Sequence, residues 1–93
     1  MSTESYIIDG ARSPIGLKNG ELVGARSDDL TAMVIKGLMK RNSSIPPEAI
    51  EDIVVGCAFP EGPQGMLMAR SISVLSELPI ESGAKVVNRF CGS

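Results

Sequence analysis

The residues of this chain alternate between short apolar runs and longer amphipathic stretches. Three short runs with β-branched or aromatic residues predict strands, at residues 6–9, 53–59 and 85–90. The run at 53–59 is apolar on both of its faces, which is typical of a strand in a parallel sheet covered by helices. Segments rich in Gly, Pro and Asn follow the first two runs and predict loops.

The first amphipathic stretch predicts a helix over about residues 28–41. Ser27 is expected to be its N-cap, and Asp28 and Asp29 lie in the first turn, where the helix dipole favours carboxylates. Basic residues occupy the last turn, which is the favourable end for cations. The apolar residues at helical spacing predict one apolar face, which consists of Leu30, Met33, Val34, Gly37 and Leu38.

A second helix is expected over about residues 66–77, where Met68, Ile72 and Leu75 share one stripe. The predicted order β-α-β-α-β indicates an α/β domain with a mainly parallel sheet. The last strand runs into Cys-Gly-Ser, a strand-to-helix junction at which Cys91 is expected to open the next helix. Because that helix would be needed to cover the last strand, we expect residues 1–93 to form an incomplete N-terminal half-domain, truncated at this junction.

Composition narrows the class of protein. Hydrophobic residues make up 43% of the 93 residues and aromatic ones only 3%, so the core must be aliphatic. The net charge of −2, with no basic stripe and no aromatic platform, argues against a nucleic-acid partner. No apolar run is long enough to span a membrane, and the first five residues lack the features of a signal peptide. We therefore expect a cytoplasmic protein with no membrane partner.

The cysteines are the candidate chemical groups. The chain has two, Cys57 and Cys91, and it has no histidine, which argues against a metal site because the common zinc ligand sets need more of both. Cys57 lies within a predicted strand and is expected to be a buried small hydrophobic residue. Cys91 fits two interpretations: a buried structural cysteine at a strand end, or a reactive cysteine at a helix N-terminus, where the dipole favours a thiolate.

Four stretches together resemble the N-terminal part of the thiolases, which are acyl-CoA C-acyltransferases. The four stretches occur in the family's order over all 93 residues. They are Ile-Ile-Asp-Gly-Ala-Arg-Ser-Pro-Ile-Gly at 7–16, Ser-Asp-Asp-Leu at 27–30, Ile-Val-Val-Gly-Cys at 53–57 with Gln-Gly at 64–65 and Ala-Arg at 69–70, and Val-Asn-Arg-Phe-Cys-Gly-Ser at 87–93. The last stretch is the most specific. The resemblance implies a thiolase-like fold, of which this chain would supply a βαβαβ portion of a mainly parallel or mixed sheet covered by helices. One departure is Leu67, where family members often have an Asn that is able to cap or tie a loop.

The resemblance also implies a function. Cys91 would be the catalytic nucleophile, acylated during the cleavage of 3-ketoacyl-CoA by coenzyme A or during the condensation of acetyl-CoA. Acyl-CoA and coenzyme A would be substrates, with no separate cofactor, and the full-length enzyme would be a homodimer or homotetramer. Two histidines and a second cysteine would come from later in the sequence, so the 93-residue chain alone is expected to be inactive.

Two other functions remain open, and four polar residues have expected supporting roles. The chain also fits a related thiolase-fold condensing enzyme or a non-catalytic thiolase-like binding module. Arg12 and Arg70 are expected to be exposed and are candidates for contacts with another subunit or with substrate phosphates. Ordering of loops or interface salt bridges is the preferred interpretation. By resemblance, Asn88 and Arg89 are expected to shape the site and a dimer interface.

Overall fold

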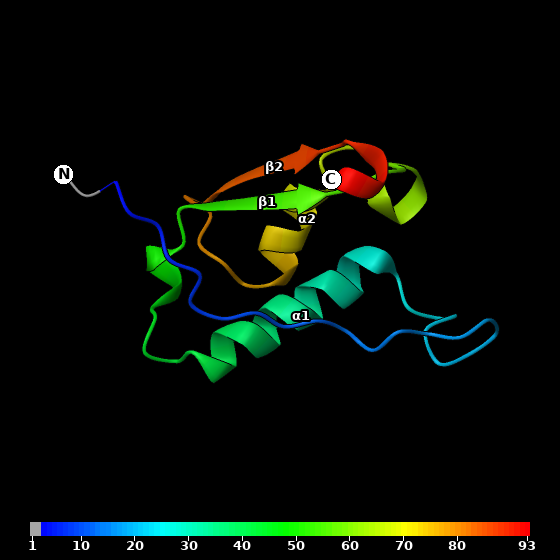
Figure 1. Ribbon diagram of the computed structural model, residues 1–93, viewed down its shortest axis with the longest axis horizontal. Coiled ribbons are helices and arrows are strands. Elements are labelled where there is room, and N and C mark those ends of the chain that lie inside the picture. Colours follow the sequence, from blue (N-terminus) through cyan, green and yellow to red (C-terminus); the bar gives the residue numbers. More distant parts are fainter. Residues whose placement is uncertain (1–2) are drawn as a thin grey trace.

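The computed structural model describes residues 3–93 and contains two helices and two strands (Figure 1). In chain order these are α1 (Ser27–Arg41), β1 (Asp52–Gly56), α2 (Met68–Leu75) and β2 (Gly83–Val87). Three single 3₁₀ turns lie between or after them, at Pro47–Ala49, Gly62–Gln64 and Phe90–Gly92.

The two strands form a parallel pair, with Asp52 opposite Gly83 and Gly56 opposite Val87. The Cys57 N–H continues this ladder by donating to the Val87 carbonyl at 3.0 Å. Helix α2 connects the strands, as a parallel pair requires, and packs against both of them. Helix α1 packs on the other side of α2, so both helices cover the same face of the sheet (Figure 1).

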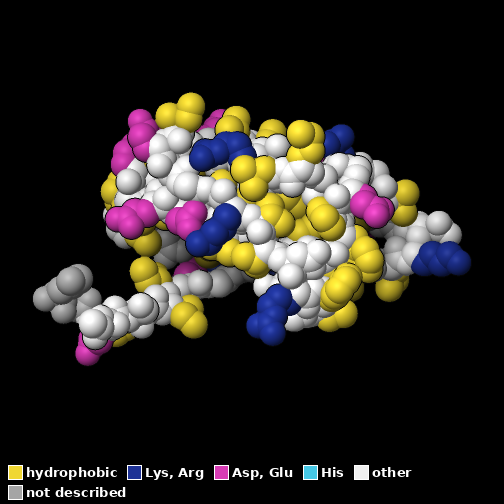
Figure 2. All heavy atoms as spheres, turned by 90° about the horizontal axis from the view of Figure 1, so that it is seen from above, with side chains coloured by type: hydrophobic (Ala, Val, Ile, Leu, Met, Phe, Trp, Pro, Cys, Tyr) yellow, Lys and Arg dark blue, Asp and Glu magenta, His cyan; other side chains and the backbone are white. Residues whose placement is uncertain are grey.

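The core lies between the sheet and the two helices. Within residues 3–93 the buried apolar residues are few, and they are Ala32, Cys57, Met68, Ala69 and Ile72. The other face of the sheet is open, since the Val54 side chain on β1 is 54% exposed. Seen from the side of β2, hydrophobic side chains gather over the middle of the molecule (Figure 2). The prediction of an α/β fold is confirmed, but only one face of the sheet is covered in the described part of the chain.

The predicted strand at residues 6–9 is wrong for this structure. The segment is exposed and runs along α1 without joining the sheet (Figure 1). Its last residue, Asp9, accepts two hydrogen bonds from Arg41 and one from Asn42, at the end of α1. These bonds hold the segment on the helix, so its apolar side chains line a groove of about 330 Å³ on α1 and make no strand pairing.

Helix α1 agrees with its predicted bounds to within one residue, but its N-cap and its buried face differ from the prediction. Arg26 occupies the N-cap position, and Ser27 is the first helical residue, with a buried hydroxyl that has no partner among residues 3–93. The guanidinium of Arg26 pairs with Asp28 at 3.1 Å and keeps the pKa of that carboxyl below its usual range. Ala32 faces the core, whereas Met33, on the predicted face, is 68% exposed.

The predicted apolar face of α1 is turned toward the N-terminal segment. Five residues of α1, namely Leu30, Met33, Val34, Gly37 and Leu38, line a groove of about 330 Å³ together with residues 11–14. The periodicity therefore predicts which residues share this face, but the partner of the face is the N-terminal segment and not the sheet. Helix α1 thus has apolar contacts on two sides.

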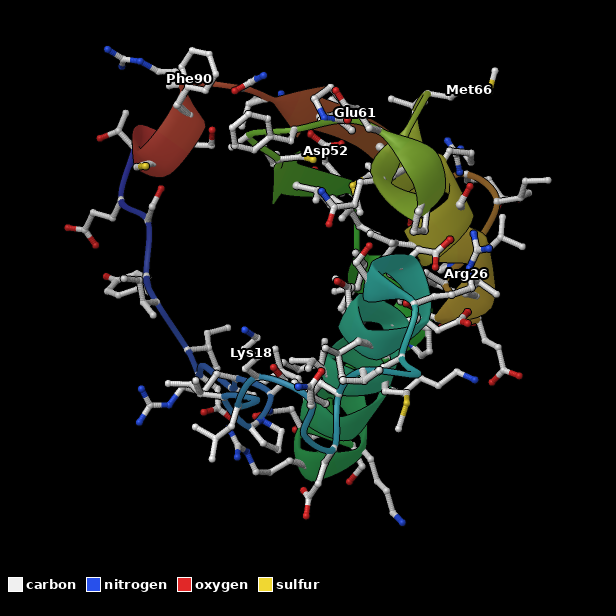
Figure 3. The ribbon with its side chains drawn as sticks, turned by 90° about the vertical axis from the view of Figure 1, so that its right-hand side faces the viewer. Lys18, Arg26, Asp52, Glu61, Met66 and Phe90 are labelled. Carbon is white, nitrogen blue, oxygen red and sulfur yellow. The ribbon has the colours of Figure 1, made fainter. Side chains whose placement is uncertain are left out.

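Helix α2 and both strands are shorter than the sequence predicts. Met66 and Glu77, the predicted ends of the second helix, both have left-handed backbone conformations, with φ of 54° and 62°, which a helix cannot include. The Met66 side chain points away from the body of the molecule and is 98% exposed (Figure 3). Strand β2 ends at Val87, three residues before the predicted limit, because Phe90 has a φ of 48° and turns the chain.

Candidate functional site at the ends of the strands

The candidate site is the segment that follows β2, residues 88–93, here called the Cys91 turn. Because β1 and β2 are parallel, their carboxyl ends lie at the same edge of the sheet, and the turn lies just beyond them (Figure 1). Ligands of α/β sheets characteristically bind outside the carboxyl ends of the strands. Cys91 is the central residue of the 3₁₀ turn Phe90–Gly92 and does not open an α-helix in the described part of the chain.

The backbone reverses sharply at Phe90. Its φ of 48° lies in the left-handed region, which is uncommon for residues other than glycine and is found at turns and functional sites. The Phe90 N–H donates to the Asn88 Oδ1 at 2.9 Å, and the Gly92 N–H donates to the Arg89 carbonyl at 2.9 Å. Figure 3 shows Phe90 at the junction between the strand and the turn. These bonds define a tight strand-to-turn junction directly before Cys91.

The Ser93 hydroxyl closes the turn from its other end. It accepts a hydrogen bond from the Arg89 N–H at 2.6 Å and donates one to the Phe90 carbonyl at 2.8 Å. This role of Ser93 was not foreseen in the sequence. The available signal was a serine shortly after a strand, a residue type whose hydroxyl commonly bonds to nearby backbone groups.

Three contacts join the Cys91 turn to the end of β1. The Asn88 Nδ2 donates to the Ala58 carbonyl at 3.2 Å, and the rings of Phe59 and Phe90 lie 6.0 Å apart with a 57° tilt. At Gly56 the backbones approach so closely that a Cβ atom would lie 2.9 Å from the Ser93 carbonyl oxygen. The position therefore requires glycine, and the turn is built on both strands.

The two cysteines have opposite environments, and both are free thiols. Cys91 is exposed on the turn, so the alternative of a buried structural cysteine at this position is wrong. Cys57 is only 6% exposed and packs with Met68 and Ile72, which confirms the prediction of a buried small residue. The Gln64 Nε2 lies 3.4 Å from the Cys57 Sγ and further limits access to it.

The other residues singled out from the sequence lie away from the Cys91 turn or support it. Arg70 is half-buried and donates to the Ser82 carbonyl at 2.9 Å, so it orders the connection from α2 to β2 and is not exposed as expected. Arg12 is exposed beside the groove on α1. Leu67 occupies the N-cap position of α2 and supplies no side-chain cap, as expected of a leucine. The interface roles of Arg12, Asn88 and Arg89 stay predictions.

Among residues 3–93, no group of three or more His, Cys, Asp or Glu side chains is arranged to hold a metal ion. No helix within those residues has the length and apolar character needed to cross a membrane.

The sequence matches the N-terminal domain of the thiolases over residues 5–93. It is 44% identical over 88 residues to a 3-ketoacyl-CoA thiolase of Marinomonas sp. (strain MWYL1), covering 94% of this chain and 22% of the relative. It is 44% identical over 91 residues to a 3-ketoacyl-CoA thiolase of Bacillus subtilis (strain 168), covering 97% of this chain and 23% of the relative. A β-ketoadipyl-CoA thiolase of Escherichia coli is 40% identical over 90 residues, 97% of this chain and 22% of that protein.

These matches place the chain in a family of acyltransferases. The chain belongs to the thiolase family, and the matched region is the family's N-terminal domain. It spans about a fifth of the length of these relatives. The α/β arrangement, with helices and a parallel strand pair, is consistent with that assignment.

Proposed function

We propose that this chain is the N-terminal part of an acyl-CoA C-acyltransferase that cleaves 3-ketoacyl-CoA with coenzyme A, and that Cys91 is its nucleophile. The observation that carries the proposal is the contrast between the two thiols. Cys91 is exposed on a braced turn at the carboxyl ends of the parallel strands, whereas Cys57 is buried. The names of the relatives support a 3-ketoacyl-CoA as the substrate class.

In the proposed reaction the Cys91 thiolate attacks the 3-keto carbon of the substrate. A sulfur–carbon bond forms, the bond between carbons 2 and 3 breaks, and its electron pair leaves on the acetyl-CoA carbanion, which takes up a proton. The thiol of coenzyme A then attacks the acyl-cysteine, releasing a shortened acyl-CoA and restoring the cysteine. Two easier steps replace one difficult step, because a thiolate is both a good nucleophile and a good leaving group.

The proposal assigns proton transfer to residues outside this chain. The 93 residues contain no histidine, and the second cysteine, Cys57, is buried in the core. A base for the Cys91 thiol and a donor for the carbanion must therefore come from the rest of a longer polypeptide. We accordingly propose that residues 1–93 are an incomplete N-terminal half-domain and are inactive alone. The complete enzyme is proposed to be a cytoplasmic homodimer or homotetramer.

Thiolysis of acetoacetyl-CoA by the full-length enzyme tests this proposal. We expect Cys91→Ala to abolish turnover, and Cys57→Ala, the matched substitution at the buried thiol, to retain it. Incubation of the unsubstituted enzyme with acetoacetyl-CoA alone should add one acetyl group to the peptide that contains Cys91, as read by mass spectrometry. Turnover by Cys91→Ala, or an acetyl group on a different cysteine, would show that the nucleophile is assigned wrongly.

A further inference from the structure

We infer that Asn88 is a positioning residue for Cys91, holding the turn that presents the thiol through the two ends of one side-chain amide. The inference rests on the proposed function of Cys91 as nucleophile. Asn88 lies directly after β2, three positions before the cysteine. Its amide bonds in two directions, along the chain to the turn and across to the end of β1.

The first bond fixes the local conformation of the turn. The Asn88 Oδ1 accepts the Phe90 N–H at 2.9 Å, a side-chain-to-backbone bond two residues along the chain, as in an Asx-turn. The bond bridges the step from Asn88, directly after the strand, to Phe90, which has the left-handed conformation. Loss of this acceptor removes one of the hydrogen bonds that stabilise the positive φ of Phe90, and so weakens the control over the direction of the following residue, Cys91.

The second bond fixes the turn in space. The Asn88 Nδ2 donates at 3.2 Å to the carbonyl of Ala58, a residue 30 positions earlier that follows β1. Of the contacts that join the Cys91 turn to the end of β1, this is the one hydrogen bond from a side chain; the others are the ring contact of Phe59 with Phe90 and the close approach of Gly56 to Ser93. The Asn88–Ala58 bond therefore helps to hold the turn at a fixed position relative to β1.

The two bonds together require the chemistry of asparagine. An amide supplies an acceptor oxygen and a donor nitrogen on the same short side chain. Aspartate keeps the acceptor, but its second oxygen would face the Ala58 carbonyl without a proton to donate. Serine keeps an acceptor for the Phe90 N–H and lacks the reach and the second group needed for Ala58. Alanine keeps neither.

The consequence for the reaction is geometric. Nucleophilic attack depends on holding the reacting atoms in a near-attack arrangement, and a misplacement of about 1 Å can lower the rate about 100-fold. Because Asn88 acts through the turn and has no assigned contact with substrate, its loss should lower kcat and leave KM nearly unchanged.

The experiment compares Asn88→Ala with Asn42→Ala in the full-length enzyme. Asn42 is a matched control, because its amide also makes two bonds, to the Leu38 carbonyl and to Asp9, at the far end of α1. We expect Asn88→Ala to lower kcat for acetoacetyl-CoA thiolysis about 10- to 100-fold with little change in KM. It should also change the rate at which iodoacetamide alkylates Cys91, whereas Asn42→Ala should change neither quantity.

A second variant, Asn88→Ser, keeps the acceptor for the Phe90 N–H and should retain an intermediate kcat. If Asn88→Ala fails to fold, the kcat of Asn88→Ser alone tests the positioning role of Asn88. A kcat for Asn88→Ser equal to that of the unsubstituted enzyme, or equal effects of the two alanine variants, would overturn the inference. Cys91→Ala distinguishes failure of the proposed function from failure of the positioning role. If Cys91→Ala remains active, the proposed function is wrong. If Cys91→Ala is inactive while Asn88→Ala has normal activity, only the positioning role of Asn88 is wrong.

Discussion

The carboxylate of Asp9 accepts two hydrogen bonds from the guanidinium of Arg41, 32 residues later, at 2.9 Å and 2.8 Å. This pair fastens the N-terminal segment to the last turn of α1. Asn42 adds a third bond to the same carboxylate at 2.8 Å. The bonds from Arg41 and then from Asn42 hold the pKa of Asp9 well below its usual range.

The attachment of the N-terminal segment is therefore expected to depend on pH. A carboxyl group whose pKa is lowered by folding stabilises the folded state above its unfolded pKa, about 3.9, and that contribution is lost as the pH falls through the lower folded value. Following the Arg41 Nε–H signal by NMR from neutral to acid pH should show the pair intact at pH 5 and released only well below about 4. Asp9→Asn should release it at neutral pH, whereas Glu21→Gln, in the loop that precedes α1, should not. Release of the wild-type pair above pH 5 would contradict this prediction.

Gly56 is expected to be the glycine of β1 that cannot be replaced. An alanine there would place its Cβ 2.9 Å from the Ser93 carbonyl oxygen, so the strand or the Cys91 turn must move. We expect Gly56→Ala to destabilise the full-length protein by about 1–3 kcal/mol, as overpacking does. Gly24→Ala is the control, because a Cβ there meets nothing within 4 Å, and its effect should stay within about 0.5 kcal/mol. Equal urea midpoints for the two variants would show that the close approach has no energetic effect.

The two thiols should differ in reactivity. Cys91 is exposed and Cys57 is 6% exposed, so native protein treated with iodoacetamide should be modified at Cys91 while Cys57 stays intact. Digestion and mass spectrometry give the extent of labelling at each site over time, and labelling in urea should make both sites equal. Faster labelling of Cys57 than of Cys91 in native protein would contradict the assignment of the buried thiol.

The 93-residue chain alone is expected not to unfold as a cooperative monomer. Its core contains few large side chains, and Ile7, Val54 and Ile80 are 98%, 54% and 80% exposed. Within residues 3–93 the sheet has two strands, and such a pair is marginally stable without further cover. Urea unfolding followed by circular dichroism should give a broad transition, and gel filtration should show self-association through the uncovered strand edges. A sharp transition from a soluble monomer would establish a self-sufficient domain and favour the binding-module alternative.

Local signals were sufficient to predict the two helices and the last two strands. The periodicity of α1 and the charges at its ends depend on near neighbours, and its bounds are accordingly correct within one residue. The ends of α2 were misplaced, because left-handed conformations at Met66 and Glu77 depend on how the chain turns there and not on the residue type. The run at residues 6–9 has the composition of a strand, but pairing needs a partner strand, and here the ion pair with Arg41 fixes the segment on α1.

The sequence identifies the candidate reactive residue of the site, but it does not predict the contacts that hold the Cys91 turn in place. Cys91 is identifiable from its neighbours in sequence, and its role as nucleophile remains a prediction. The Ala58 carbonyl that bonds to Asn88, and the close approach of Gly56 to Ser93, join residues about 30 or more positions apart. Such contacts depend on the register of the two strands, which periodicity does not specify.

The contacts between the Cys91 turn and the end of β1 determine where insertions in the chain can be tolerated during evolution. Every brace starts from one short stretch, residues 56–59, so an added residue there would shift the turn relative to the sheet. The loop that follows, around the 3₁₀ turn Gly62–Gln64, contributes none of these braces and is exposed at Glu61 and Pro63. Length variation among homologous chains should therefore be concentrated beyond residue 60, and stretch 56–59 should keep a fixed length wherever the cysteine is retained.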